Sequence, residues 1–209
     1  MARPSGTGAY PGILIIHENR GLNDHTKDIA RRYAKEGFVG LAIDLVSRNG
    51  GTVADIALNT GALGRSNPDD LVTDLIAALA YLKAQPSTQG KALGVTGFCF
   101  GGGYTFEVVA NSKDVKAGVP YYGSATRPLE KLATTQAAVL VMYGGTDARI
   151  TGQSADVDAK LKASGKPYEI KVYPEAGHAF FNETGQAYNA AAAADAWKLT
   201  LAWFRRHLA

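Results

Sequence analysis

The chain has 209 residues, 46% of them hydrophobic and 20% charged, with a formal net charge of +3. This length and composition fit a single α/β domain over residues 1–209 with a buried core, and they exclude a disordered chain. The basic residues form no run of like charge beyond the pairs Arg31-Arg32 and Arg205-Arg206. We therefore expect no nucleic-acid partner.

The chain has one cysteine, Cys99, which excludes an internal disulfide and any need for an oxidising compartment. The first residues, MARPSGTGAYPG, contain no apolar signal region. No apolar run is long enough to cross a bilayer. These features predict a cytoplasmic protein without a membrane partner. We expect a monomer or a small homo-oligomer.

Short apolar runs alternate with amphipathic segments along the chain. Residues 12–18 form an apolar run rich in β-branched side chains, which is typical of a strand buried on both faces. From Asp24 onward, apolar residues recur at helical spacing up to Gly37, which predicts a helix. A second strand is expected over residues 38–44. The polar, glycine-rich residues 45–67 are expected to form a long loop with about one turn of helix.

The second part of the chain repeats this alternation. Asn67 is suited to cap a helix over residues 67–85, with Pro68 in its first turn. Further strands are expected over residues 92–98, 115–123, 137–145 and 168–174, and further helices over residues 102–111, 154–165 and within 184–208. The pattern predicts an α/β fold with a mostly parallel sheet, helices on both faces and right-handed crossovers.

Cys99 lies between a predicted strand and a predicted helix, in the pattern G-x-C-x-G. This is the setting of a nucleophile elbow, where the nucleophile has strained backbone angles and its neighbours must be small. Gly97 and Gly101 meet that need because glycine has no Cβ. The turn would place the sulfur at a helix N-terminus, whose dipole favours a thiolate. The alternative is a small buried cysteine in a glycine-rich turn.

Two segments after Cys99 end in residues that could complete a catalytic triad. Asp147 follows one predicted strand and His178 follows the next, in the order nucleophile, acid, histidine that α/β-hydrolases use. Both lie beyond carboxyl ends of strands, where open α/β sheets build their sites. His178 could hold the thiol proton and Asp147 could orient the imidazole. Taken singly, Asp147 could instead be a turn or cap residue and His178 an ordinary loop histidine.

The other histidines are weaker candidates. His25 and His207 fall on predicted helices and are expected at the surface, and His17 is expected to support the loop after the first strand. His17, Glu18 and His25 lack the H-E-x-x-H spacing of a zinc site, and there is no cysteine cluster. We expect neither a metal nor a cofactor.

With Cys99, Asp147 and His178 in these places, the sequence resembles the dienelactone hydrolase family, also called carboxymethylenebutenolidases. The matching segments are ILIIHENRGLNDHTKDIARRYAKEGFVGLAIDL, GVTGFCFGGGYTF, YYG, VLVMYGGTD and YPEAGHAFFN, which span the chain from about Tyr10 onward. A cysteine where most α/β-hydrolases carry serine makes the match specific. The resemblance implies the α/β-hydrolase fold and hydrolysis of a small-molecule enol-lactone or similar carboxylic ester.

The resemblance also implies a fourth residue, Glu18, which would lie near the nucleophile and help to generate the thiolate. Its negative charge would also oppose a nearby thiolate, and we expect the resting thiol to be largely protonated. The backbone N–H groups of Phe100 and Asn19 are the expected oxyanion donors. We expect an apolar pocket lined by aromatic side chains, with Tyr122, Phe98, Phe180 and Phe181 as candidates. The alternative is that these aromatic residues belong to the core.

Two features depart from the family pattern. The family carries extra strands before residues 12–18, so the expected sheet lacks those first strands. Members that act on dienelactone hold its carboxylate with arginines, one of them just past the histidine, where this chain has AFFN. Arg20, Arg48 and Arg65 lie near predicted active-site loops without an assigned role. A broader carboxylesterase therefore stays open as an alternative.

Three other functions compete with ester or lactone hydrolysis. A thioesterase or acyltransferase could use the same triad. A non-catalytic relative could act as a binding module, although binding alone requires none of Cys99, Asp147 and His178. A redox role is conceivable for a lone thiol of low pKa, but the chain offers no resolving cysteine.

Overall fold

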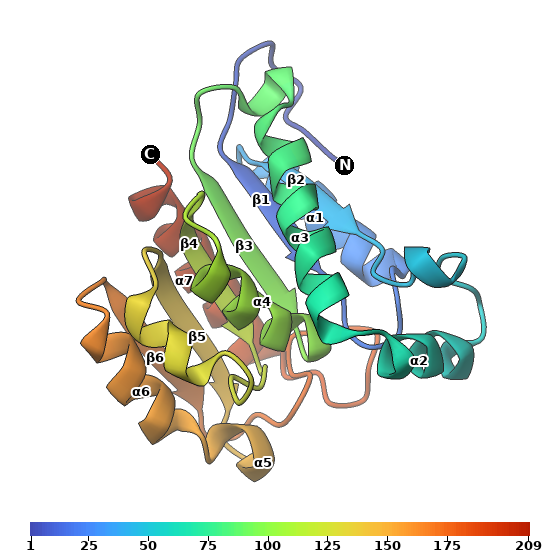
Figure 1. Cartoon of the computed structure of the whole chain (residues 1–209). Helices are drawn as coiled ribbons and strands as arrows, with labels where there is room; N and C mark the ends of the chain where they lie inside the picture. The colour runs from blue at the N-terminus through green and yellow to red at the C-terminus, as the bar shows by residue number, and fades with distance from the viewer.

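The computed structural model describes all 209 residues, and its six strands form one sheet in the order β2-β1-β3-β4-β5-β6 (Figure 1). The strands are β1 (Gly12–Ile16), β2 (Val39–Ile43), β3 (Leu93–Phe98), β4 (Val115–Tyr121), β5 (Ala138–Gly144) and β6 (Tyr168–Tyr173). Every neighbouring pair is parallel. The predicted parallel sheet is thus confirmed.

Helices follow the strands in alternation, as predicted. The helices are α1 (Asp24–Lys35), α2 (Ile56–Arg65), α3 (Pro68–Lys83), α4 (Phe100–Asn111), α5 (Ala148–Thr151), α6 (Ser154–Ala163) and α7 (Ala190–His207). Short 3-10 turns occur at η1 (Ser47–Asn49), η2 (Pro86–Thr88) and η3 (Leu129–Thr134). Helices α3, α4 and α6 cover one face of the sheet, and α1 and α7 cover the other (Figure 1).

Two hydrophobic cores, one on each face, explain the unbroken apolar strands. In β1, Leu14 and Ile16 pack into the core beneath α3 and α4, while Ile13 and Ile15 pack into the core beneath α1 and α7. All four side chains are fully buried. Because successive strand residues point to opposite faces, a strand between two cores must be apolar at every position.

Side-chain caps begin the helices where the sequence predicts them. The Asn67 Oδ1 atom accepts a hydrogen bond from the N–H of Asp69 at 2.9 Å, with Pro68 at the first helical position of α3. The Asn23 Oδ1 atom accepts from the N–H of Thr26 at 3.0 Å and caps α1. Each cap satisfies a backbone donor that the first turn leaves unpaired.

The region between β2 and α3 differs from the prediction of a long loop. The ten-residue helix α2 occupies residues 56–65, and Asp55 caps it. Gly61 and Gly64 lie within the helix although glycine has low helix propensity. Apolar side chains at its start also face solvent. The usual helical signals are therefore weak in the sequence. The helix is stabilised by packing of Ala62 and Leu63 into the core beneath α3, α4 and α6.

The residues before β1 extend the sheet by one contact. Ala2 forms an antiparallel bridge with Gly40 of β2, with N–H to O distances of 2.8 and 2.9 Å. This bridge covers part of the edge that β2 would otherwise expose.

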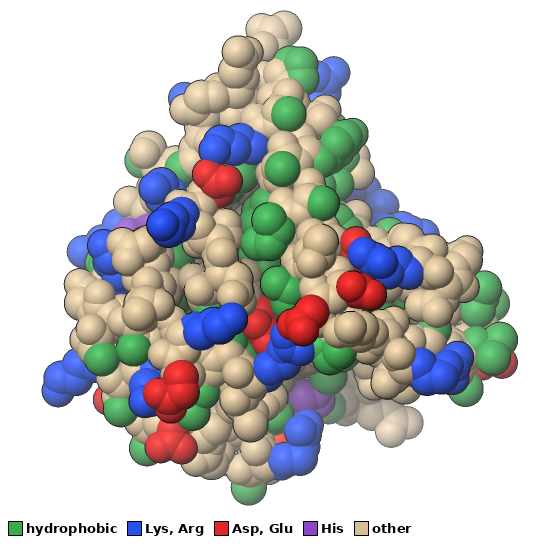
Figure 2. Space-filling model, in the orientation of Figure 1, with side chains coloured by type: hydrophobic (Ala, Val, Ile, Leu, Met, Phe, Trp, Pro, Cys, Tyr) green, Lys and Arg blue, Asp and Glu red, His purple; other side chains and the backbone are tan.

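The surface carries interleaved charges. On the face covered by α3, α4 and α6, acidic and basic side chains lie next to one another and alternate with small apolar areas (Figure 2). None of the helices combines the length and the apolar character that crossing a membrane requires.

Candidate active site

Cys99 occupies a strained turn between β3 and α4. Its backbone angles are φ 55° and ψ −111°, an unfavourable region for a residue with a Cβ, which costs about 1–3 kcal/mol. The Cys99 N–H donates to the Tyr121 carbonyl at 3.1 Å, and the Gly103 N–H donates to the Cys99 carbonyl at 3.1 Å. Backbone bonds on both sides therefore hold the strained conformation, as a nucleophile elbow requires.

The glycines around Cys99 are needed for backbone contact. A Cβ on Gly97 would collide with the carbonyl group of Gly101, and a Cβ on Gly101 would collide with the carbonyl oxygen of Ile16 at the end of β1. The expected role of both glycines is confirmed. Their packing brings the end of β1 against the turn that carries the sulfur.

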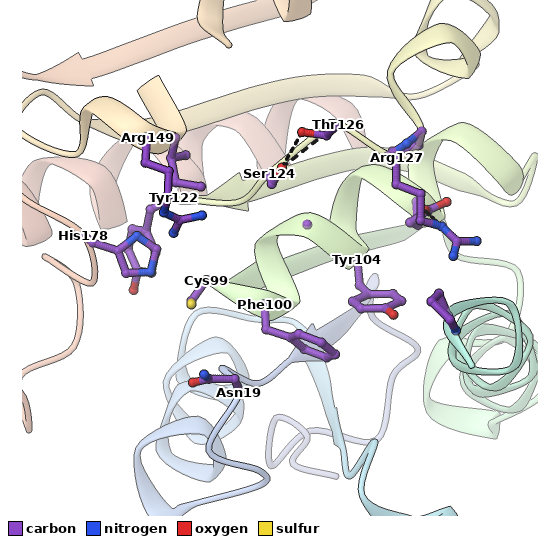
Figure 3. Close-up of a pocket in the computed structure, with 15 residues that line it drawn as sticks. Asn19, Cys99, Phe100, Tyr104, Tyr122, Ser124, Thr126, Arg127, Arg149 and His178 are labelled. Atoms are coloured by element: carbon purple, nitrogen blue, oxygen red, sulfur yellow. Dashed lines mark hydrogen bonds and ion pairs between the residues drawn. The ribbon is translucent and has the colours of Figure 1, made fainter. Parts of the chain in front are cut away.

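His178 and Asp147 meet at the same edge of the sheet. His178 lies in the loop after β6 and Asp147 directly after the turn that ends β5, and their Nδ1 and Oδ2 atoms are 2.6 Å apart. The Asp147 side chain is 8% exposed, so little water competes for this bond. With Nδ1 engaged by Asp147, the other ring nitrogen is left for Cys99, and the ring lies on the same side of the pocket as the Cys99 sulfur (Figure 3).

The surroundings of His178 favour its charged form. Hydrogen bonding to Cys99 is the largest cause, and together with Asp147 it raises the pKa of His178 to about 9, although burial acts in the opposite direction. These contacts favour the protonated imidazole over the neutral ring. A positive charge beside the sulfur stabilises a thiolate.

Glu18 leaves the sheet beside Cys99. Ile16 of β1 pairs with Gly97 of β3, so Glu18 and Cys99 each lie two residues beyond a paired position on neighbouring strands. The Glu18 Oε2 atom accepts a hydrogen bond from Asn182 Nδ2 at 2.9 Å, and its Oε1 atom is buried without a partner. The carboxylate is thus a buried group at the level of the nucleophile. Asn182 is a contact that sequence analysis missed, and its position four residues after His178 is the only signal for it.

The two expected oxyanion donors border the pocket next to the sulfur. Asn19 and Phe100 both line it, and Figure 3 shows them next to Cys99. The Asn19 N–H has no acceptor within the protein. The Phe100 N–H belongs to the first turn of α4, where N–H groups lack helical partners.

An open pocket of about 390 Å³ extends from Cys99 along α4. Cys99, His178 and Arg149 lie at one end, and Tyr104 and Arg127 lie at the other (Figure 3). Its apolar wall consists of Pro68, Phe100, Tyr104, Pro128 and Ile150. The volume is within the range of small-molecule sites.

The aromatic lining differs from the expected one. Tyr122 does line the pocket, whereas Phe98, Phe180 and Phe181 do not, because they are buried in the core beneath α1 and α7. Phe98 and Phe181 stack there with ring centroids 5.3 Å apart. These three residues are therefore core residues rather than substrate contacts.

Phe100 and Tyr104 supply the aromatic wall instead, and sequence analysis missed Tyr104. The two rings are 4.7 Å apart on successive turns of α4. Their spacing of four residues on a helix that starts at the nucleophile was a usable signal, because residues i and i+4 share a helix face.

Two arginines at the pocket also escaped sequence analysis, and they differ in pairing. Arg127 Nε donates to Glu107 Oε1 at 2.6 Å, and its Nη2 bonds Asp69. Arg149 is exposed, with no ion pair, and lies near His178 (Figure 3). Its place two residues after Asp147 was a signal for it. None of the three arginines considered from the sequence, Arg20, Arg48 and Arg65, lines the pocket.

Two of the remaining histidines, His17 and His25, have structural partners, whereas His207 is half-buried on α7 with its ring 4.5 Å from that of Trp203. His25 is buried, with Nδ1 3.0 Å from Glu183 Oε1, so its expected surface position is wrong. It faces the segment after His178, which covers that side of α1. His17 Nε2 accepts a hydrogen bond from the Leu45 N–H at 3.0 Å, and its Nδ1 contacts the Glu18 carbonyl. His17 therefore supports the loop after β2 as well as the turn after β1. No three His, Cys, Asp or Glu side chains gather in an arrangement that could hold a metal ion.

Known proteins share both the sequence and the fold of this chain. The model of the dienelactone hydrolase family matches residues 1–208. A protein of Methylorubrum extorquens, provisionally named carboxymethylenebutenolidase, is 36% identical over 219 aligned residues, covering 99% of this chain and 75% of its own length. A relative from Escherichia coli strain K12 with the same provisional name is 34% identical, with coverages of 99% and 81%.

Solved structures agree with this relationship. A provisionally named dienelactone hydrolase from Klebsiella pneumoniae has a TM-score of 0.88 at 29% identity, covering 98% of this chain and 90% of that one. A dienelactone hydrolase-like promiscuous phosphotriesterase from metagenomic libraries has a TM-score of 0.83 at 26% identity, with coverages of 98% and 89%.

The glycine packing at the elbow leads to a first prediction. Gly101→Ala should lower the free energy of unfolding by more than about 2 kcal/mol and abolish ester hydrolysis, since the new Cβ would overlap the Ile16 carbonyl. Gly64→Ala is the matched control, because nothing lies within 4 Å of its Cβ position in α2. The control should gain about 0.5–1 kcal/mol in urea unfolding. Equal stability of the two variants would contradict the packing argument.

The raised pKa of His178 predicts a pH dependence of stability. The folded state holds the His178 proton more tightly than the unfolded state does, so protonation of His178 adds to the free energy of unfolding. This addition is complete below the ordinary pKa of 6.5 and is lost as the pH rises through about 9. An NMR titration of the His178 ring should give a pKa near the upper value. Cys99→Ala should move the midpoint toward 6.5, since the largest cause is removed. Identical midpoints in the two proteins would exclude the contact as the cause.

Proposed function

Because the chain belongs to the dienelactone hydrolase family and is an ester or lactone hydrolase of that type, we propose that Cys99, His178 and Asp147 form its catalytic triad. The observation that carries the proposal is the 2.6 Å bond from His178 to Asp147 beside a strained cysteine at the mouth of the pocket. Residue type, order and position at the sheet edge all fit nucleophilic catalysis.

The reaction would proceed through a thioester. The Cys99 thiolate attacks the carbonyl carbon and forms a C–S bond, while the carbonyl oxygen becomes an oxyanion that accepts hydrogen bonds from the N–H groups of Asn19 and Phe100. The C–O bond then breaks, and His178 gives its proton to the leaving oxygen. Water, deprotonated by His178, attacks the thioester, releases the acid and restores the thiolate.

A cysteine nucleophile favours substrates with a good leaving group. The tetrahedral intermediate can expel either the leaving oxygen or the thiolate, whose conjugate acid has a pKa of about 8.5. An ordinary alkoxide leaves far less readily, so attack on an alkyl ester would mostly reverse. An enolate is resonance-stabilised and leaves more readily. We therefore propose an enol-lactone or an activated ester as substrate. A hydrolysis screen of lactones, thioesters, alkyl esters and p-nitrophenyl esters of graded chain length tests this choice.

We also assign the unpaired Arg149 to substrate binding. It lies at the Cys99 end of the pocket, whereas Arg127 at the far end is occupied by Glu107 and Asp69. A free guanidinium can bind a carboxylate through two parallel hydrogen bonds. The arrangement favours a substrate with an acidic group close to the scissile bond and an apolar part against Phe100.

Glu18 is proposed to tune the nucleophile. Its buried negative charge opposes a thiolate on Cys99, whereas the protonated His178 stabilises one. The carboxylate can also accept the thiol proton. We propose that it keeps the resting thiol protonated until substrate binds.

The triad proposal predicts the behaviour of single and double variants. Cys99→Ala should lower kcat at least about 1,000-fold without unfolding the protein, and His178→Ala should be nearly as severe. The double variant should lose little more than either single one, because the residues act as a unit. Steady-state rates with p-nitrophenyl acetate, together with circular dichroism, measure both effects. Retention of most of the activity in Cys99→Ala would overturn the proposal.

The role of Arg149 predicts selectivity by charge. Arg149→Ala should raise KM about tenfold for an ester with a nearby carboxylate and leave KM unchanged for the methyl ester of the same compound. Arg20→Ala is the control, since Arg20 is exposed and outside the pocket. A loss of the same size for both substrates would show that Arg149 does not read their charge.

The role of Glu18 predicts a change in kcat with a change in ionisation. Glu18→Gln should lower kcat more than it raises KM, and the thiolate absorbance and alkylation rate of Cys99 should rise at lower pH than in the natural protein. Glu175→Gln, which changes an exposed carboxyl three residues before His178, is the control. Coincident pH curves with unchanged turnover would make Glu18 a bystander.

A further inference from the structure

Tyr122 has a backbone conformation that its side chain alone would not favour. It directly follows β4 at the carboxyl edge of the sheet, with φ 37°, in the left-handed region that aromatic residues seldom adopt. Its N–H still donates to the Met142 carbonyl of β5 at 2.8 Å. The strain is thus retained within an ordered sheet edge, which is typical of residues whose side-chain direction matters.

The Tyr122 ring is clamped beside the triad. Its centroid is 5.1 Å from that of His178 and 5.4 Å from that of Phe180, both edge-to-face, and 6.3 Å from that of Phe98. The side chain is fully buried although it borders the pocket. Little freedom is left to it except rotation of the hydroxyl hydrogen.

Two residues at this edge of the sheet each have a buried polar atom without a partner. These atoms are the Tyr122 hydroxyl and the Oε1 atom of Glu18. A buried polar group left unpaired costs about 1–3 kcal/mol, so the coincidence of a free donor and a free acceptor is significant. Strand β3 lies between β1 and β4, so Glu18 beyond β1 and Tyr122 beyond β4 flank Cys99 at the same edge of the sheet. Burial raises the pKa of the Tyr122 hydroxyl, and the negative charges of Glu18 and Cys99 raise it further.

The other oxygen of the same carboxylate is already held. Asn182 Nδ2 donates to Glu18 Oε2 at 2.9 Å. A second donor on Oε1 would fix the plane of the carboxylate and satisfy all of its buried oxygens. Hydrogen bonds to a carboxylate favour its charged form.

We propose that Tyr122 is a positioning residue whose hydroxyl donates to Glu18 Oε1 and, with Asn182, holds this carboxylate charged beside Cys99. The inference rests on the proposed function of Glu18 and names the group through which that function is maintained. It requires only rotation of the hydroxyl and a small adjustment of the carboxylate. The strained backbone of Tyr122 then serves to bring a phenol to a carboxylate on a different strand.

Tyr122→Phe tests the proposal because it removes one hydroxyl and leaves the ring in place. The variant should lower kcat about tenfold with little change in KM. Without its donor the carboxylate more readily takes up a proton, so the pH curve for alkylation of Cys99 by iodoacetamide should move to lower pH by about half a unit. Alkylation needs no turnover, so this readout is independent of whether the triad hydrolyses a given ester.

Tyr143→Phe is the matched control. Tyr143 is also fully buried with an unpaired hydroxyl, but it lies in the core beneath α3, α4 and α6 and away from the pocket. It should leave the alkylation curve and kcat unchanged. In a Glu18→Gln background, Tyr122→Phe should produce no further shift, because the group through which it acts is gone.

Three results would overturn the assignment. An unchanged alkylation curve would show that the hydroxyl does not influence the carboxylate. A shift to higher pH would mean that Tyr122 donates to the thiolate directly. An equal shift of the alkylation curve in the Glu18→Gln background would show that Tyr122 does not act through Glu18. Failure of Cys99→Ala to lose activity would instead count against the triad and leave the alkylation result standing.

Discussion

The structure of this protein depends on a close backbone contact at the turn between β3 and α4. Gly101 lies against the end of β1, and Gly102 lies against the Tyr121 carbonyl at the end of β4. Since no side chains separate these segments, the carboxyl ends of three strands meet within one turn of helix. This contact sets the backbone strain at Cys99 and brings Glu18, Cys99 and Tyr122 to one place. Backbone packing therefore fixes the positions of the candidate catalytic residues, independently of the contacts between their side chains.

The polar groups of the site are mostly buried, which strengthens their effect on one another. Asp147 and Glu18 are both below a tenth exposed, and each has at least one short hydrogen bond. At low effective dielectric, a charge on one group changes the proton affinity of the next more than it would in water. The segment after His178 matters here because it carries Asn182 as well as Glu183, which binds His25 of α1.

The pocket combines an apolar wall with two arginines in different electrostatic states. Arg127 is neutralised by two carboxylates, and its ion pair with the buried Glu107 joins α4 to the loop after β4. Arg149 has no such partner. The same residue type therefore serves as a structural link at one end and as an available charge at the other. Selectivity in such a pocket depends on which charges are already satisfied rather than on how many are present.

The amino-acid sequence alone determined the alternation of strands and helices, the turn at Cys99 and the order of Asp147 and His178, because apolar runs, glycine positions and strand ends are local patterns. It also led to the correct family. It did not determine which aromatic side chains face the pocket, because a strand that is apolar on both faces has no periodicity to show where each residue points. Phe98 is therefore a core residue, whereas Tyr104 lines the pocket. Helix α2, the unpaired state of Arg149 and the burial of Tyr122 beside the pocket depend on contacts between distant segments, and only the tertiary structure decided them.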